Sequence, residues 1–208
     1  MITKENEITS LLKDQLKPKY YKILIRKYPS NSSRIKNMLI QSHGILPSLR
    51  PEIDMIFFEK GGMFNAVEIK FFKKNEMNEK VAFYKGIDQA LALYKYGFDN
   101  VGLWHFFSSN ITVEEINKFG AETWYFIRNS LKLSLNFSYF KIEEENEDIK
   151  FSVLQYINRR SGFNLGCKID DNNFKITFRY GNPLILAGDH YTIKTREILY
   201  NYYLNKGA

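Results

Sequence analysis

Three ionisable residues stand in two short apolar segments of the sequence, in a pattern that could do chemistry. The stretch RPEIDMIFFEKGGMFNAVEIK, residues 50–70, holds Asp54 in the first segment and Glu68 and Lys70 in the second. A charged group buried without a partner carries a large desolvation cost. The pattern therefore indicates either a shared ligand or a surface cluster in which Lys70 neutralises Glu68.

The spacing of the two segments predicts how these residues meet. Runs at about 52–59 and 63–70 are strand-like and flank Lys60-Gly61-Gly62, which is typical of a three-residue hairpin loop. Pairing centred on Gly61 places Asp54 opposite Glu68, with Cβ atoms about 5 Å apart. Lys70 shares that face because side chains alternate along a strand. A two-residue loop would instead pair Asp54 with Ile69.

Two facing carboxylates repel each other, and one ammonium offsets only part of that repulsion. Mg²⁺ or Mn²⁺ prefers oxygen ligands, and Mg²⁺ is commonly held by one or two carboxylates together with water. The backbone carbonyl of Ile69 is a further candidate ligand. Such an ion activates a water and stabilises charge on a phosphoryl group, while Lys70 orients the water or neutralises that charge. The pattern favours metal-dependent hydrolysis of a phosphodiester.

Composition limits the classes of protein that fit. The chain has 208 residues, a hydrophobic fraction of 44% and a formal net charge of +7. This suits one folded domain with an appended piece, and the basic excess favours a nucleic-acid partner, DNA first with RNA left open. The single Cys167 excludes an intrachain disulfide framework and a cysteine zinc cluster, and predicts a reducing, cytoplasmic location. The sequence contains no uninterrupted apolar run of about 18 residues, the length that would predict a membrane span.

Periodicity predicts an α/β fold in which a central mixed sheet is flanked by helices. Expected helices lie at 3–16 (capped by Thr3), 81–98, 112–119 and 192–204. Expected strands lie at 20–28, 52–59, 63–70, 100–107, 122–128, 174–180 and 184–187. Loops are expected at 29–34 and 43–51, and 141–150 is expected to be a solvated loop or hairpin end. We expect a core over residues 1–128 and a C-terminal α+β extension over 129–208.

The sequence resembles the PD-(D/E)XK nuclease superfamily, with its restriction-endonuclease-like and archaeal Holliday-junction resolvase-like members. The resemblance is carried by PEID (51–54), VEIK (67–70) and YKGIDQALALYKYGFDNVGLWH (84–105), within roughly residues 3–107. It implies a restriction-endonuclease-like core with the order αβββαβ. It also implies a Mg²⁺-dependent endonuclease acting on DNA, including junction or branched DNA, and a homodimer. The proline is separated from Asp54 by two residues, so a literal PD is absent.

The resemblance also implies roles for single residues. Asp54 and Glu68 would be metal ligands and Lys70 the catalytic lysine. Gln89, with Lys85 one turn earlier, would contact the water or the substrate phosphate. Family members often add a glutamate from the first helix, for which Glu5 is favoured over Glu7 because it shares the apolar side with Ile8. Either acid could equally serve the dipole of that helix.

Basic residues around the expected cleft are candidates for phosphate contacts, which position nucleic acid without reading its sequence. They are Lys85, Lys73, Arg50 and Arg34, with His43 placed near the mouth of the site. Singly, each is also consistent with an ordinary solvated surface charge. A non-catalytic nucleic-acid-binding protein with a nuclease-like fold is the alternative function, and a purely structural protein is the third.

Overall fold

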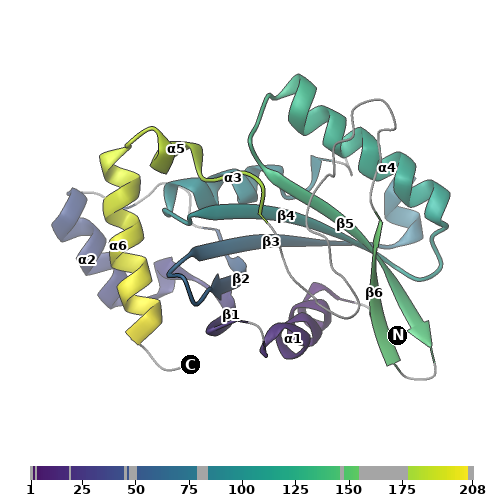
Figure 1. Ribbon diagram of the computed structural model, residues 1–208, viewed down its shortest axis with the longest axis horizontal. Helices are drawn as coiled ribbons and strands as arrows, with labels where there is room; N and C mark the ends of the chain where they lie inside the picture. The colour runs from purple at the N-terminus through teal and green to yellow at the C-terminus, as the bar shows by residue number, and fades with distance from the viewer. Residues whose placement is uncertain are drawn as a thin grey trace.

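The computed structural model describes residues 2, 4–18, 20–44, 46, 51–78, 84–145, 148–154 and 178–205, which form an α/β structure around one mixed sheet (Figure 1). The strands are β1 (Lys22–Lys27), β2 (Ile53–Phe58), β3 (Phe64–Phe72), β4 (Asn100–Phe107), β5 (Asn136–Glu145) and β6 (Asp148–Leu154). The α-helices are α1 (Glu5–Leu16), α2 (Ser33–His43), α3 (Ile87–Lys95), α4 (Val113–Tyr125), α5 (Pro183–Leu186) and α6 (His190–Asn205). Short 3-10 turns η1 (Pro29–Asn31) and η2 (Lys74–Asn78) and the π-helical turn η4 (Phe126–Ser130) complete the described elements.

The six described strands lie in the sheet in the same order as in the sequence, β1-β2-β3-β4-β5-β6. Strands β1, β2 and β3 are antiparallel neighbours, β3, β4 and β5 run parallel, and β6 returns antiparallel to β5. The parallel strands are joined through α3 and α4, as parallel connections require. Strand β3 is therefore central, with a hairpin partner on one side and a parallel partner on the other.

Each face of the sheet has its own apolar core. On one face, α1 buries Ile8, Leu12 and Leu16 against side chains of β2, β3 and β4, including Trp104 and Phe106. On the other face, α2, α3, α4 and α6 pack over the alternate residues of the same strands. Figure 1 shows α1 below the sheet and α4 above it. Among the described helices, none is long and apolar enough to cross a membrane.

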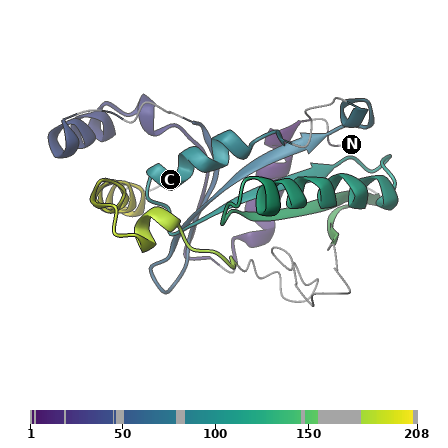
Figure 2. The same cartoon turned by 90° about the horizontal axis from the view of Figure 1, so that it is seen from above.

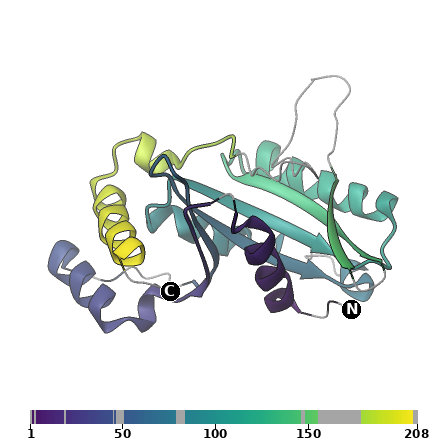
Figure 3. The ribbon, with the colours of Figure 1, turned by 60° about the horizontal axis from the view of Figure 1, so that its bottom comes forward.

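The C-terminal region is continuous with the rest of the fold. Strands β5 and β6 extend the same sheet, and α6 packs beside α2 at one end of the molecule (Figures 2 and 3). Helix α6 also packs on the end of α3. This contact depends on Gly97, because a Cβ there would lie 2.5 Å from the carbonyl oxygen of Thr192. The division into residues 1–128 and 129–208 stays a prediction.

Three expected elements are wrong. The expected strand at 122–128 belongs to α4 and η4, where Ile116, Phe119, Thr123 and Ile127 continue a helical stripe into the core. The expected strand at 184–187 is largely the short helix α5, which begins after the Asn182 cap. The loop at 29–34 and the apolar run after it form η1 and most of α2.

Other expectations hold within the described ranges. The strands at 20–28, 52–59, 63–70 and 100–107 and the helices at 3–16 and 192–204 are present with shifted ends. Within the expected loop or hairpin end at 141–150, residues 141–145 and 148–150 are paired residues of β5 and β6. The expected helix at 81–98 is seen as α3 over its C-terminal half. Some predictions lie outside the described residues. They concern Thr3, residues 79–83, most of the strand expected at 174–180, and residues 45 and 47–50 of the loop expected at 43–51, with Arg50.

Candidate active site

The hairpin of β2 and β3 has the expected register. Met55 pairs with Val67 and Phe57 with Asn65, and Gly62 at the end of the three-residue loop has φ of 81°. The left-handed conformation explains a glycine at that position. Extending the ladder by one residue places Asp54 opposite Glu68.

Strand β3 continues beyond the start of β2, and carboxylates meet its backbone there. The Ile69 N–H donates to Asp54 Oδ2 at 2.7 Å, and the Phe71 N–H donates to Glu5 Oε1 at 3.2 Å. Two N–H groups of β3, two residues apart on the same edge of the strand, thus donate to side chains from β2 and from the first turn of α1. Glu5, the acid that the helical spacing favoured, thus contacts the backbone of the sheet.

Lys70 and Glu68 form a buried ion pair. Lys70 Nζ lies 2.6 Å from Glu68 Oε1, and the exposed fractions of the side chains are 15% and 1%. Asp54 is also buried, at 8% exposure. The surface-cluster interpretation of this motif does not fit that burial. The second carboxylate oxygen, Glu68 Oε2, is buried and accepts no hydrogen bond.

Negative charge exceeds positive charge in this cluster, and the titration of its groups reflects the excess. Burial raises the pKa of Asp54 to about 6, against the hydrogen bond from Ile69 and the charge of Lys70. Burial, and then the charge of Asp54, raise the pKa of Glu68 to about 8. Burial opposes the charge on Lys70, but Glu68 outweighs it, so the pKa of Lys70 is raised. Without a further cation, the two carboxylates therefore retain a proton between them near neutral pH.

Helix α3 fixes the position of Lys70. Gly86, at the N-cap of α3 with φ of 84°, leaves room for the lysine, since a Cβ there would lie 3.0 Å from Lys70 Cγ and Cε. Gln89 is half-buried in the first turns of the same helix. Lys85 precedes the cap, with its ammonium 5.7 Å from the centre of the Phe72 ring. Gly86 thus brings the start of α3 against Lys70. The contacts predicted for Gln89 and Lys85 with the water or the substrate phosphate stay predictions.

His105 lies on β4 directly across the ladder from Lys70, but within the core. Its Nε2 is 3.1 Å from the carbonyl oxygen of Lys85, which makes Nε2–H the donor. Burial lowers the pKa of His105 to about 3, so the ring is neutral. It supports the turn before α3.

An exposed ion pair borders the cluster on the β1 side. Arg26 Nε lies 2.7 Å from Glu52 Oε1, and Arg26 Nη2 lies 3.4 Å from the Tyr28 hydroxyl. The hydrogen bond to Tyr28 and the charges of Glu52 and Asp54 raise the pKa of Arg26. Arg26 also has φ of 50°, unusual for a non-glycine residue. Sequence reasoning missed Glu52 and Gly86; the acid in PEID and the glycine before α3 were the available signals.

The outlying basic residues have different surroundings. Exposed Lys73 follows β3 and lines a cavity of about 470 Å³ with Lys74, Ser108 and Asn110. Exposed Arg34 is in the first turn of α2 and lines a different cavity. Their nucleic-acid contacts stay predictions, as does that of Arg50, which is not among the described residues.

His43 is held by α6 instead of facing the acidic cluster. Its ring stacks on Tyr191 with 4.0 Å between centroids, and its Nε2 lies 3.0 Å from Thr195 Oγ1. Burial, with the nearby charges of His190 and Lys194, lowers the pKa of His43. The structure therefore does not group His43 with Asp54, Glu68 and Lys70, and its predicted contact with nucleic acid has no support from these neighbours.

Comparison with known proteins does not identify a role for the cluster of Asp54, Glu68 and Lys70. No protein-family model matches the chain, and no curated protein matches it either. Across the described ranges, no group of three His, Cys, Asp or Glu side chains is arranged to hold a metal ion by itself. The cluster therefore consists of two facing carboxylates and Lys70, with Glu5 bound to the backbone beside them.

Proposed function

We propose that the protein is a metal-dependent nuclease that hydrolyses phosphodiester bonds in DNA. The observation that carries this proposal is the buried Asp54–Glu68–Lys70 cluster, in which Glu68 Oε2 has no hydrogen-bond partner. A buried acceptor without a partner is unfavourable unless a ligand completes it. Perturbed carboxylate pKa values caused by burial and by a like charge are typical of functional sites.

The donor set fits Mg²⁺ or Mn²⁺. Mg²⁺ is usually bound by one or two carboxylates and keeps several waters, and Asp54 and Glu68 supply that number. The Ile69 carbonyl and Glu5 are the proposed additional ligands. A bound divalent ion supplies a water of lowered pKa and stabilises negative charge on phosphoryl oxygens.

The protein groups around the ion would orient the reaction. Lys70 donates to the attacking water or to a phosphoryl oxygen, and its packing on Gly86 limits the positions that its ammonium can take. Gln89, in the first turn of α3, would hydrogen-bond the water or the phosphate. Asp54 is itself held by the Ile69 N–H, which fixes its carboxylate relative to β3.

The order of elements supports the same proposal. Helix α1, strands β1, β2 and β3, helix α3 and strand β4 follow one another as in the PD-(D/E)XK core, with α2 inserted between β1 and β2. The acid on β2 and the E-x-K pattern on β3 occupy the positions that the resemblance implies. Exposed Lys73, which follows β3, is the proposed contact with the DNA backbone on this side of the site. A homodimer would bring two such sites to two strands.

The test is cleavage with Mg²⁺ of plasmid, linear and branched DNA, and of RNA of matched sequence. Wild type is compared with Asp54→Ala, Glu68→Ala and Lys70→Ala, and with Lys118→Ala, an exposed lysine on α4, as the control. We expect wild type and the Lys118→Ala control to cleave DNA, and the other three variants not to cleave it. Activity that survives all three substitutions ends the proposal.

A non-catalytic nucleic-acid-binding protein is the second candidate. The 2.6 Å Lys70–Glu68 ion pair favours it, because the chain already neutralises one carboxylate internally. A binder of this kind loses affinity for DNA as salt rises but shows no saturable metal site. Calorimetric titration with Mg²⁺ at constant ionic strength separates the two candidates.

A further inference from the structure

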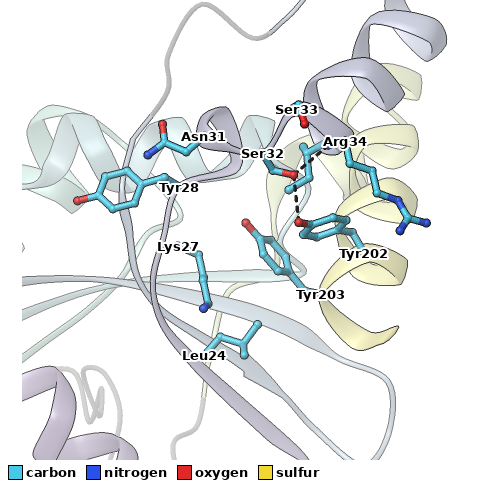
Figure 4. A pocket seen from close by; sticks show the side chains of 10 residues that line it. Leu24, Lys27, Tyr28, Asn31, Ser32, Ser33, Arg34, Tyr202 and Tyr203 are labelled. Carbon is cyan, nitrogen blue, oxygen red and sulfur yellow. Dashed lines mark hydrogen bonds between the residues drawn. The ribbon is translucent and has the colours of Figure 1, made fainter. Parts of the chain in front are cut away.

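A second cavity, of about 480 Å³, lies at the β1 edge of the sheet, between the start of α2 and the end of α6. Figure 4 shows Lys27, Tyr202 and Tyr203 across this cavity, with Tyr28 and Arg34 at opposite sides. Its lining is Leu24, Lys27, Tyr28, Asn31, Ser32, Ser33, Arg34, Ile35, Tyr202 and Tyr203. The volume is within the range of sites for small organic ligands, about 300–1,000 Å³.

The charged residues among the described lining of this cavity, the α2–α6 pocket, are both cations. They are Lys27 and Arg34, and neither forms an ion pair with another described residue. Nearby Lys22 is bound to the carbonyl oxygen of Tyr203 at 2.8 Å. Burial, and then repulsion from Lys27, lower the pKa of Lys22. An anion in the pocket would relieve that repulsion.

The remaining lining suits an aromatic, polar ligand. The Ser32 hydroxyl donates to the Tyr202 hydroxyl at 3.0 Å, which joins α2 to α6 across the pocket. Three tyrosines and the Asn31 amide supply ring surface and hydrogen-bonding groups. Cationic groups combined with aromatic rings are the means by which proteins hold single nucleotides of a strand, the rings stacking on bases and the cations contacting phosphates.

The α2–α6 pocket is on the same side of the sheet as the acidic cluster. Leu24 and Tyr203 belong to the core on the α3 face, and Lys70 packs on Gly86 at the start of α3. Strand β1 is two strands from β3, which is about 10 Å at the usual spacing. Tyr28, in the pocket wall, is bonded to Arg26, which is close enough to Asp54 to be influenced by its charge.

We propose that the α2–α6 pocket binds one unpaired nucleotide of the nucleic-acid strand that is cut at the Asp54–Glu68–Lys70 cluster. The base packs against the tyrosine rings and a phosphate pairs with Lys27 or Arg34. The proposal rests on the proposed nuclease function and names its substrate class: strands with an unpaired segment, such as overhangs, flaps and branched junctions. Fully paired DNA lacks a free nucleotide for the pocket.

The experiment measures binding of full-length protein to fluorescent oligonucleotides by anisotropy, with EDTA present so that none is cut. The probes are a blunt duplex, the same duplex with a single-stranded overhang, and the single strand. The variants are Lys27→Ala/Arg34→Ala and Tyr28→Ala. The matched controls are Lys118→Ala and Tyr125→Ala, on α4. Mononucleotide is added as a competitor.

We expect the double variant to weaken binding of the overhang and the single strand about tenfold or more, and to lower the salt slope by about one. Tyr28→Ala should weaken the same probes about fivefold. The blunt duplex and the controls should change less than twofold. Equal affinity of wild type and pocket variants for the overhang overturns the proposal. The proposal is also overturned if the pocket variants lose binding of the mononucleotide but keep binding of the overhang and the single strand, because the pocket would then be a site for a free nucleotide.

Cleavage assays separate this proposal from the nuclease proposal. Binding of the overhang through the pocket without cleavage by wild type in Mg²⁺ contradicts only the nuclease function. Cleavage by wild type together with unaltered overhang binding by the pocket variants contradicts only the pocket proposal.

Discussion

Charged groups cluster near both ends of β3, and the two clusters are built in opposite ways. Near the start of the strand, Asp99 is bound by Arg196 at 2.6 and 2.7 Å and also accepts the Phe64 N–H at 2.7 Å. Near the other end, Asp54, Glu68 and Glu5 share the single ammonium of Lys70. Only the second cluster has a buried carboxylate oxygen without a partner. A balanced cluster serves the fold, whereas surplus buried charge points to a ligand.

The largest expected effect concerns activity. Glu68→Gln keeps the shape of the side chain but removes its charge, so we expect cleavage of supercoiled plasmid to fall on the order of 10²–10³-fold. Asp99→Asn should leave the rate per folded molecule unchanged. Initial rates at equal concentrations of folded protein test this. Equal losses in both variants would remove the distinction between the clusters.

Stability should show the reverse order. Asp99→Ala leaves the part-buried Arg196 unpaired, and we expect the free energy of unfolding to fall by about 3 kcal/mol. In metal-free protein, Glu68→Gln should raise it by about 1 kcal/mol, because an uncharged amide avoids the desolvation of a buried carboxylate and the repulsion with Asp54. Urea denaturation in EDTA measures both. A metal-free Glu68→Gln protein that is the less stable of the two variants would contradict the account.

The pH dependence of stability sharpens the comparison. The pKa values of Asp54 and Glu68 are raised by folding to about 6 and about 8, so the folded state binds more protons than the unfolded state between about pH 4 and pH 8. Metal-free stability should therefore fall across that window as pH rises, by about 1.4 kcal/mol per pH unit where one proton is involved. Glu68→Gln should flatten the decline, and Asp99→Asn should retain it. A stability that rises steadily from pH 5 to pH 8 would oppose the assigned shifts.

Binding of metal is expected to stabilise the folded protein only modestly. At a Mg²⁺ concentration about ten times the dissociation constant, linkage gives about 1.4 kcal/mol. For a chain of this size, that corresponds to a rise in Tm of about 3–5 °C. Thermal denaturation should show the rise in wild type and Asp99→Asn but not in Glu68→Gln. A rise that persists in Glu68→Gln would place the metal elsewhere.

The geometry of the cluster could be predicted from sequence because short-range rules determine it. A three-residue loop ending in Gly62 fixes the hairpin register, and the register fixes which side chains face each other. The approach of Glu5 follows from its helical spacing to Ile8. The burial of the cluster, and the partnerless Glu68 Oε2, depend on helices that pack from distant parts of the chain, so no local pattern contained them.

The errors have local explanations. The residues at 122–128 are rich in aromatic side chains, which favours a strand, but Thr112 begins a helix with a capping box and the core stripe continues through Thr123 and Ile127. Helix α2 was missed although Ser32 caps it and Gly44 ends it in a left-handed conformation. The serine-rich start resembled a turn, so the α2–α6 pocket could not be foreseen.

The most direct test of the central claim is diffraction from crystals soaked in Mn²⁺, with data collected to locate the metal by its anomalous signal. The account predicts one peak with oxygens of both Asp54 and Glu68 within about 2.5 Å, and Lys70 moved from its 2.6 Å contact with Glu68. Absence of a peak at saturating Mn²⁺, with the Lys70–Glu68 ion pair intact, would contradict it.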